Sequence, residues 1–173
     1  MGVRNYLIDG VSGAGKTAVA TELQRRSYQV VHGDRELAYR GDPETGAPVT
    51  PPTDRPTALW MSEHHIWDVA KVRALIADRA APVTFFCGGS RNSGKFIDLF
   101  DGVFVLEVDR DTMNRRIDER VARDPTEFGA NEDERALIDH LFATMEDVPK
   151  IGVRIDATAP IASVVDAILA RCV

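Results

Sequence analysis

Residues 6–17 read Tyr-Leu-Ile-Asp-Gly-Val-Ser-Gly-Ala-Gly-Lys-Thr, and this stretch decides how the rest of the chain is interpreted. Tyr6, Leu7 and Ile8 form a short apolar run before the first glycine, which predicts a buried strand. Residues 16–26 follow with an apolar stripe that includes Val19 and Leu23, which predicts a helix. The stretch is therefore a strand, a glycine-rich turn and the start of a helix.

The turn fits the pattern G-x-x-x-x-G-K-[ST]. Its glycines permit backbone conformations in which successive N–H groups point inward at phosphate oxygens, and the following helix adds its positive end. Lys16 would reach the β- and γ-phosphates, and the hydroxyl of Thr17 would ligate Mg²⁺. The sequence therefore predicts that the chain binds ATP, or a close relative, with magnesium. The predicted nucleotide-binding residues of this loop are Gly10, Val11, Ser12, Gly13, Ala14, Gly15, Lys16, Thr17 and Ala18.

The composition is that of a globular protein with one domain over residues 1–173, with 44% hydrophobic and 28% charged residues. The net charge of −6 and the lack of a basic face argue against a nucleic-acid or membrane-surface partner. No apolar stretch approaches the ~20 residues of a membrane-spanning helix, and no signal peptide is evident. Two cysteines, Cys87 and Cys172, are expected to be reduced packing thiols. We expect a cytoplasmic monomer or homodimer.

Strands and helices alternate along the remaining chain. Helical periodicity marks four further helices, over residues 66–76, 113–121 (with Asp111 as N-cap), 137–145 and 161–172. The further strands are expected at residues 29–31, 83–87, 103–108 and 153–155. This alternation predicts an α/β fold, a three-layer α/β/α sandwich with a five-stranded parallel sheet.

Residues 41–57 interrupt the alternation. This segment carries five prolines, a density that no helix or strand tolerates. It is either a long functional loop over a site or a partly disordered flap.

The phosphate loop in this context resembles that of the P-loop kinases of small molecules, which act on nucleosides, nucleotides, shikimate or gluconate. The resemblance covers essentially the whole chain in the order of its elements. It implies the P-loop NTPase fold, with the five strands in the order 2-3-1-4-5. It also implies an ATP-dependent phosphotransferase with a small-molecule acceptor.

Residues 31–37, Val-His-Gly-Asp-Arg-Glu-Leu, look like the end of the second strand of shikimate kinases. That family has two acidic residues there, one residue apart. Asp34 matches the second, which implies that it holds the acceptor hydroxyl, and a carboxylate there can also accept its proton. His32 replaces the first, which departs from the pattern and argues against shikimate itself. A plain turn residue at Asp34 and a packed strand-end histidine at His32 are the alternatives.

The third expected strand ends in Cys87-Gly88-Gly89-Ser90-Arg91. In the kinase resemblance, Gly88 and Gly89 would let the acceptor approach and Arg91 would grip it. No aspartate ends this strand, so the usual Walker B carboxylate is missing there, as also occurs within the shikimate kinase pattern. A tight turn and a solvated arginine are the alternatives.

Residues 105–108 and 116–120 look like the fourth strand and the lid-bearing helix of adenylate kinase-like proteins. The resemblance implies that Arg116 stacks near the base and that Arg120 contacts phosphates, and the spacing puts both on one helix face, extended by Arg123. Arginines suit phosphoryl transfer because their fork of donors follows charge on the equatorial oxygens. A short lid is expected over about 120–135. A solvated face is the alternative.

Residues 156–160, Asp-Ala-Thr-Ala-Pro, resemble the adenine-side loop of the same kinases. This implies a backbone contact to the base from Thr158 and Pro160, with a plain helix-capping role as the alternative. Trp60, His64, His65 and Trp67 are expected at the start of the third helix, in core or acceptor-pocket packing. A zinc pair is disfavoured because adjacent histidines point apart on a helix.

The favoured hypothesis is a kinase that uses ATP and Mg²⁺, with Lys16, Asp34, Arg116 and Arg120 as catalytic residues. The second is an ATP-binding regulatory NTPase without a small-molecule acceptor, and the third is a degenerate binding domain, against which the intact Lys16 and Thr17 argue. The acceptor stays open: Asp34 and the glycine pair favour a hydroxyl, whereas Arg91 and the arginine stripe leave a nucleotide open.

Overall fold

The computed structural model describes residues 3–172 and is built on a five-stranded sheet. All strand pairs in this sheet are parallel. In sheet order the strands are β2 (Gln29–His32), β5 (Val83–Cys87), β1 (Arg4–Gly10), β6 (Gly102–Glu107) and β7 (Val153–Asp156). Counted along the chain within this sheet, that is the expected order 2-3-1-4-5.

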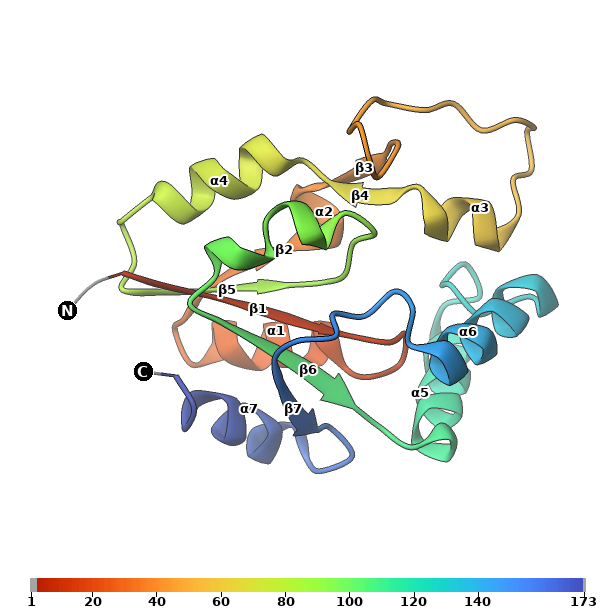
Figure 1. Cartoon of the computed structure of the whole chain (residues 1–173). Helices are drawn as coiled ribbons and strands as arrows, with labels where there is room; N and C mark the ends of the chain where they lie inside the picture. The colour runs from red at the N-terminus through yellow and green to blue at the C-terminus, as the bar shows by residue number, and fades with distance from the viewer. Residues whose placement is uncertain (1–2, 173) are drawn as a thin grey trace.

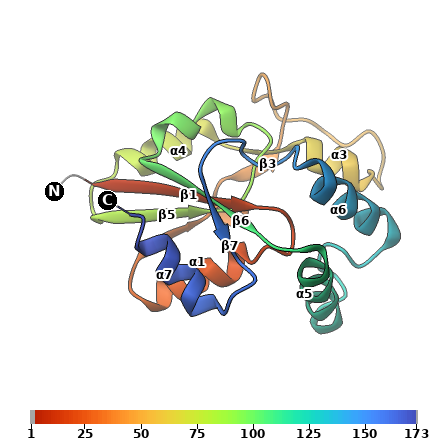
Figure 2. The same cartoon turned by 60° about the horizontal axis from the view of Figure 1, so that its bottom comes forward.

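The helices cover the sheet in layers. They are α1 (Lys16–Arg25), α2 (Gly33–Glu36), α3 (Ala58–Glu63), α4 (Val69–Ala77), α5 (Arg110–Arg123), α6 (Glu132–Thr144) and α7 (Ile161–Leu169), with short 3₁₀ helices η1 (Ser93–Lys95) and η2 (Ile97–Leu99). Figures 1 and 2 show α1 and α7 side by side on one face of the sheet and α4 on the other. Helices α3, α5 and α6 gather beyond the carboxyl ends of the strands (Figure 1). The predicted three-layer α/β/α sandwich is confirmed.

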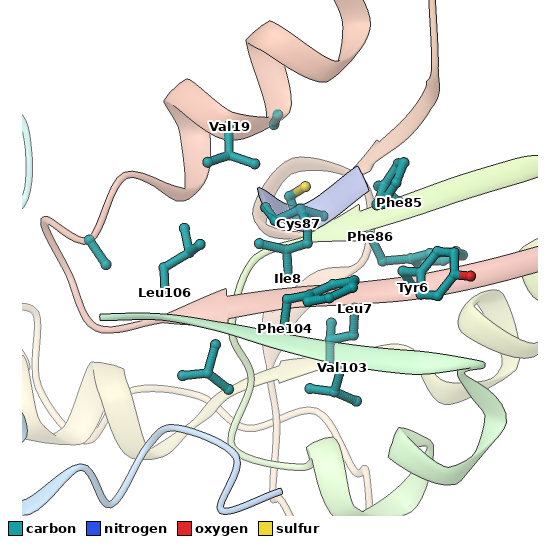
Figure 3. Packing of buried hydrophobic residues seen from close by; sticks show 14 of the residues in the cluster. Tyr6, Leu7, Ile8, Val19, Phe85, Phe86, Cys87, Val103, Phe104 and Leu106 are labelled. Carbon is teal, nitrogen blue, oxygen red and sulfur yellow. The ribbon is translucent and has the colours of Figure 1, made fainter. Parts of the chain in front are cut away.

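The central strand β1 is apolar on both faces because helices cover both. Tyr6, Leu7 and Ile8 are at most 2% exposed, as expected of a parallel strand in the middle of a sheet. Ile8 lies beside Cys87 in the register of β1 and β5, and Figure 3 shows both side chains on the side of the sheet that faces Val19 of α1. The continuous apolar run therefore encodes the central position of this strand.

Several helix ends differ from the periodicity. The expected helix 66–76 begins only at Val69, because the carboxylate of Asp68 caps it by accepting from Lys71 N. Helix α5 begins earlier than expected, because Asp109 and not Asp111 is its N-cap, accepting from Thr112 N. Two helices end before the residue expected from the periodicity. Helix α6 ends at Thr144, because Met145 adopts a left-handed conformation, and α7 ends at Leu169, before Cys172.

A second, two-stranded sheet was not expected from the sequence. In it, β3 (Ala38–Arg40) pairs antiparallel with β4 (His65–Trp67). Ile66, whose spacing suggested a helix, is fully buried in β4. The side-chain amide of Asn92 accepts from Trp67 N and donates to Trp67 O, so the turn after β5 holds β4 in place.

Within residues 41–57 the structure has turns and one isolated bridge, between Gly41 and Pro48, but no helix or strand. This agrees with the prediction from its proline content. Figure 1 shows the segment arching away from the body between β3 and α3.

Both cysteines are free thiols. Cys87 lies in the core, where burial raises the pKa of its thiol to about 12. Among the described residues, no helix combines the length and apolar character that a membrane crossing requires.

We predict that Gly33→Ala destabilises the fold. A Cβ at Gly33 would lie 1.9 Å from Cζ2 of Trp67, a buried ring that stacks on Phe96. Overpacking of this kind costs about 1–3 kcal/mol, so the urea midpoint should fall with an unchanged m-value. Gly94→Ala is the matched control, because a Cβ there meets nothing within 4 Å. Equal midpoints for the two variants would contradict this account of how β4 packs.

Candidate active site

A cavity of about 1230 Å³ opens at the carboxyl ends of the sheet strands. The phosphate loop and the first turn of α1 line it, together with residues of α2, α3 and the β3–β4 sheet. Helix α5, the segment after it and the loop before α7 complete the lining. A ligand there would touch most of the elements that follow sheet strands, as is usual for open α/β sheets.

The phosphate loop connects β1 directly to α1, as the sequence predicted. Gly13 and Gly15 have φ of +82° and +102°, backbone angles that favour glycine. All residues of the predicted loop line the cavity except Val11, which is buried beneath it. The turn therefore presents its backbone to open space.

Lys16 folds back over the loop. Its Nζ donates to the carbonyl oxygens of Gly10 and Val11, the latter at 3.2 Å. The ammonium thus lies within the loop, at the place where phosphates bind in such loops. Thr17, the expected magnesium ligand, is exposed at the cavity wall.

The arginines of α5 reach the same loop. Arg116 donates to Ala14 O at 3.1 Å and to Ala157 O at 2.6 Å, so it bridges the phosphate loop and the loop before α7. Arg120 donates to the hydroxyl of Ser12 at 3.2 Å. Burial lowers the pKa of the Arg120 guanidinium from its ordinary value. Arg123 also lines the cavity, so the structure brings this predicted stripe together.

The segment expected as a lid runs between α5 and α6. Arg120 donates to Phe128 O, and the carboxylate of Glu134 accepts from the backbone N–H groups of Gly129 and Ala130. Asp124, Glu127 and Phe128 line the cavity. The segment is thereby tied to both the arginine stripe and the first turn of α6.

Of the predicted acceptor-side residues, Asp34, Gly89 and Arg91 line the cavity, and Gly88 does not. Asp34 is in the first turn of α2, with its side chain 58% exposed. Gly88 has a φ of +145°, and a Cβ there would lie 2.9 Å from Cζ2 of Trp67 and 3.1 Å from Oδ1 of Asp34, so this position favours glycine. Arg91 lines the cavity, donates to the hydroxyl of Ser62 at 2.9 Å and keeps its Nε buried without a partner among the described residues.

Other predicted positions are arranged differently. The carboxylate of Asp156 accepts from both the N–H and the hydroxyl of Thr158, and Pro160 is the N-cap of α7. Neither Thr158 nor Pro160 lines the cavity, whereas Ala157 and Ala159 do. His32 also lies outside the lining, and its N–H donates to Glu36.

Among the charged and polar cavity residues that the sequence reasoning did not name as site residues are Arg40, Asp147 and Asp9, and it gave His65 only as a residue of core or acceptor-pocket packing. Arg40 and His65 come from the unexpected β3–β4 sheet, and Asp147 comes from the loop between α6 and β7. No local pattern marks these three. Asp9 could have been noticed, because it is a charged residue directly after the apolar run of β1.

Asp9 is a buried carboxyl, 2% exposed, under the phosphate loop. Its Oδ1 accepts from Gly10 N at 2.6 Å, and a Cβ at Gly89 would lie 2.8 Å from that oxygen. Burial raises the pKa of Asp9 to about 7, against the lowering influence of the Lys16 charge. A carboxyl thus lies beside the end of β5, the strand that lacks a terminal aspartate of its own.

Asp147 adds a second carboxyl to the cavity, and this one is half-buried. Its Oδ1 has no hydrogen-bond partner among the described residues. Burial raises its pKa, while the charges of Lys16 and Arg91 act in the opposite direction. The charge of Lys16 therefore acts on three carboxyls that line the cavity, those of Asp9, Asp34 and Asp147.

The donor set fits a magnesium ion carried by a nucleotide. Within residues 3–172, no three His, Cys, Asp or Glu side chains are grouped as a metal site. Mg²⁺ in nucleotide sites is held mainly by phosphates and waters with few protein ligands. The exposed hydroxyl of Thr17 at the cavity wall is suited to that single role.

Solved structures share this architecture. A sugar kinase from Janibacter sp. HTCC2649 superposes with a TM-score of 0.57 over 97% of this chain and 93% of its own, at 18% identity. A shikimate kinase from Acinetobacter baumannii in complex with shikimate gives 0.57 over 96% and 91%, also at 18% identity. The chain has the fold of the P-loop small-molecule kinases. A gluconokinase from Sinorhizobium meliloti 1021 gives 0.54 over 96% and 90%, at 20% identity.

Comparison of the sequence alone finds no relative, in contrast to comparison of the fold. No protein-family model matches it, and no curated protein is similar to it in sequence.

We predict that Asp9→Asn alters how stability depends on pH. The native state holds the proton of Asp9 more tightly than the unfolded chain, whose pKa is 3.8. The contribution of Asp9 therefore falls as pH rises from about 4 to about 7, by up to about 4 kcal/mol. Asparagine keeps an oxygen for Gly10 N–H but does not ionise.

The measurement is urea unfolding of both proteins, without nucleotide, at a series of pH values. The free energy of unfolding of the wild type minus that of Asp9→Asn should decrease across this range. A difference that stays constant with pH would contradict a buried, proton-binding Asp9.

Proposed function

We propose that this protein transfers the γ-phosphoryl group of ATP to a hydroxyl group of a small-molecule acceptor, with Mg²⁺ as cofactor. One observation carries the proposal. One cavity is lined by the phosphate loop with Lys16, by Asp34 with its exposed carboxylate, and by Arg91, Arg116 and Arg120. This is the arrangement that in-line phosphoryl transfer requires, with a donor clamp, cations for the developing charge and a group to orient the nucleophile.

Each residue has a separate part in the proposed reaction. Backbone N–H groups of the loop and Lys16 would hold the β- and γ-phosphates, and the hydroxyl of Thr17 would hold Mg²⁺. Arg116 and Arg120 stabilise charge on the transferred group. Asp34 accepts a hydrogen bond from the acceptor hydroxyl and directs its oxygen at phosphorus. Bound Mg²⁺ would supply positive charge that neutralises the phosphates.

Two features support a hydroxyl acceptor over a phosphate acceptor. The acceptor wall offers the exposed carboxylate of Asp34, which would repel a phosphate and attract a hydroxyl. The solved structures that share the fold include a kinase in complex with shikimate and a gluconokinase, and both named compounds carry hydroxyl groups. Arg91, which faces the same space, would contact another part of the acceptor.

We expect Lys16→Ala to reduce acceptor-dependent ADP formation by at least about 100-fold, because it removes a cation that follows the transferred charge. The assay is ADP production from Mg-ATP with each of several acceptors: nucleosides, nucleoside monophosphates, sugar acids, shikimate and aminoglycoside-like antibiotics. Unfolding midpoints should show that the variant remains folded.

Lys71→Ala, on the exposed side of α4, is the matched control and should behave as wild type. Full turnover in Lys16→Ala would refute the mechanism. ADP formation by the wild type that no acceptor stimulates would instead favour a regulatory NTPase.

A further inference from the structure

Three side chains form a hydrogen-bonded row that ends at the cavity. Nη1 of Arg40 lies 3.0 Å from Nδ1 of His65, and Nε2 of the same ring lies 3.0 Å from Oδ1 of Asp34. All three residues line the cavity. The row joins β3, β4 and α2, which are far apart in the sequence.

The guanidinium of Arg40 and the carboxylate of Asp34 determine which ring nitrogen of His65 carries the proton. A guanidinium has only donors, so Nδ1 of His65 accepts from Arg40. The ring is then neutral, with its proton on Nε2, and this N–H donates to the carboxylate of Asp34. Histidine tautomers are assigned in this way, from the partners of the two nitrogens.

We propose that His65, set in its tautomer by Arg40, is a positioning residue that holds Asp34 ionised and correctly oriented toward the acceptor hydroxyl. This inference rests on the proposed kinase function for its catalytic meaning. It assigns roles to two residues outside the phosphate loop and the arginine stripe. The hydrogen bond occupies Oδ1 of Asp34, and Oδ2, which makes no hydrogen bond within residues 3–172, remains for the acceptor.

The backbone around His65 is rigid, as a positioning role requires. Arg40 and His65 are direct partners in the antiparallel β3–β4 register, so their side chains are neighbours on one face. His65 O accepts from Arg91 N at 2.9 Å, which ties β4 to the turn after β5. The clamp of Asn92 on Trp67, two residues further along, fixes the other end of the strand.

Electrostatics favour an ionised Asp34. Burial acts to raise the pKa of Asp34, whereas the hydrogen bond from His65 and the positive charges around the carboxylate act to lower it, and the pKa lies below its ordinary value. Asp9, from β1, is the acidic group that faces it. Loss of the His65 hydrogen bond should therefore raise the pKa of Asp34. Activity that needs the ionised carboxylate would then fail at a higher pH as the solution is acidified.

Two substitutions of His65 separate positioning from packing. The amide nitrogen of glutamine can reach the place of Nε2 and still donate to Asp34, whereas asparagine reaches only the place of Nδ1. We expect His65→Asn to lower kcat at neutral pH by about 10- to 100-fold, as for a misplaced catalytic group, and to move the acid limb of kcat/KM to higher pH. His65→Gln should stay within several-fold of wild type, and KM for ATP should be unchanged in both.

His64→Asn is the matched control. The adjacent His64 ring stacks on Trp60 and contacts Trp60 O, and it lies outside the cavity lining. This variant should keep wild-type kcat and pH profile. Equal losses in His65→Gln and His65→Asn, or an unmoved acid limb in His65→Asn, would overturn the positioning role.

A second readout does not depend on activity. The chain has only four histidines, so ¹⁵N–¹H correlation spectra of the imidazole rings can be assigned by comparison with His65→Gln. At pH 7 the ring of His65 should be neutral and protonated on Nε2, and Arg40→Met should remove this preference. An imidazolium, or a proton on Nδ1, would overturn the inference.

The two proposals can fail separately. If the wild type turns over an acceptor but His65→Asn behaves as wild type, the positioning role fails and the kinase function stands. If the wild type transfers phosphate to no acceptor, the kinase function fails and the catalytic meaning of the row fails with it. The spectra then decide only whether the hydrogen-bonded row exists.

Discussion

The parallel pairing of β1 with β5, and of β5 with β2, brings three turns of the chain to one edge of the sheet. The phosphate loop follows β1, Asp34 follows β2, and the glycine pair with Arg91 follows β5. Since carboxyl ends of neighbouring parallel strands meet at the same edge, groups far apart in sequence come to line one cavity. Gly88 and Gly89 have no Cβ, so the carboxylates of Asp34 and Asp9 can approach the turn after β5 closely.

Charge balance within the cavity follows from this convergence. The charge of Lys16 acts on three carboxyls, those of Asp9, Asp34 and Asp147, and the arginines of α5 line the same cavity. Burial and charge act differently on each carboxyl: the pKa is raised for Asp9 and Asp147 but lowered for Asp34. One carboxylate is thus kept ionised where the acceptor would bind, while the one under the phosphate loop favours its proton.

The donor half of the site could be predicted because its information is local. Residues 6–17 specify a strand, a turn and a helix within one motif, and the i, i+4 spacing of Arg116 and Arg120 specifies a shared face. The acceptor half depends on contacts between distant segments. Strands β3 and β4 have three residues each and no alternation long enough to detect, and Ile66 shares helical spacing with Val69 although Asp68 begins the helix only afterwards. Nothing local to Asp147 shows that it lies beside Lys16.

The two halves of the site also differ in how the fold holds them. The phosphate loop is held by its glycines and by β1. The residues proposed for the acceptor side lie largely in the connection between β2 and β5, whose geometry depends on the Asn92 clamp, on Trp67 packing against Gly33 and on the pairing of Arg40 with His65. The proline-rich segment, residues 41–57, follows β3 in that connection and reaches the cavity at Pro56. In the proposed reaction, the side chains that would contact the acceptor are therefore held by long-range contacts, whereas those that would hold ATP belong to one local motif.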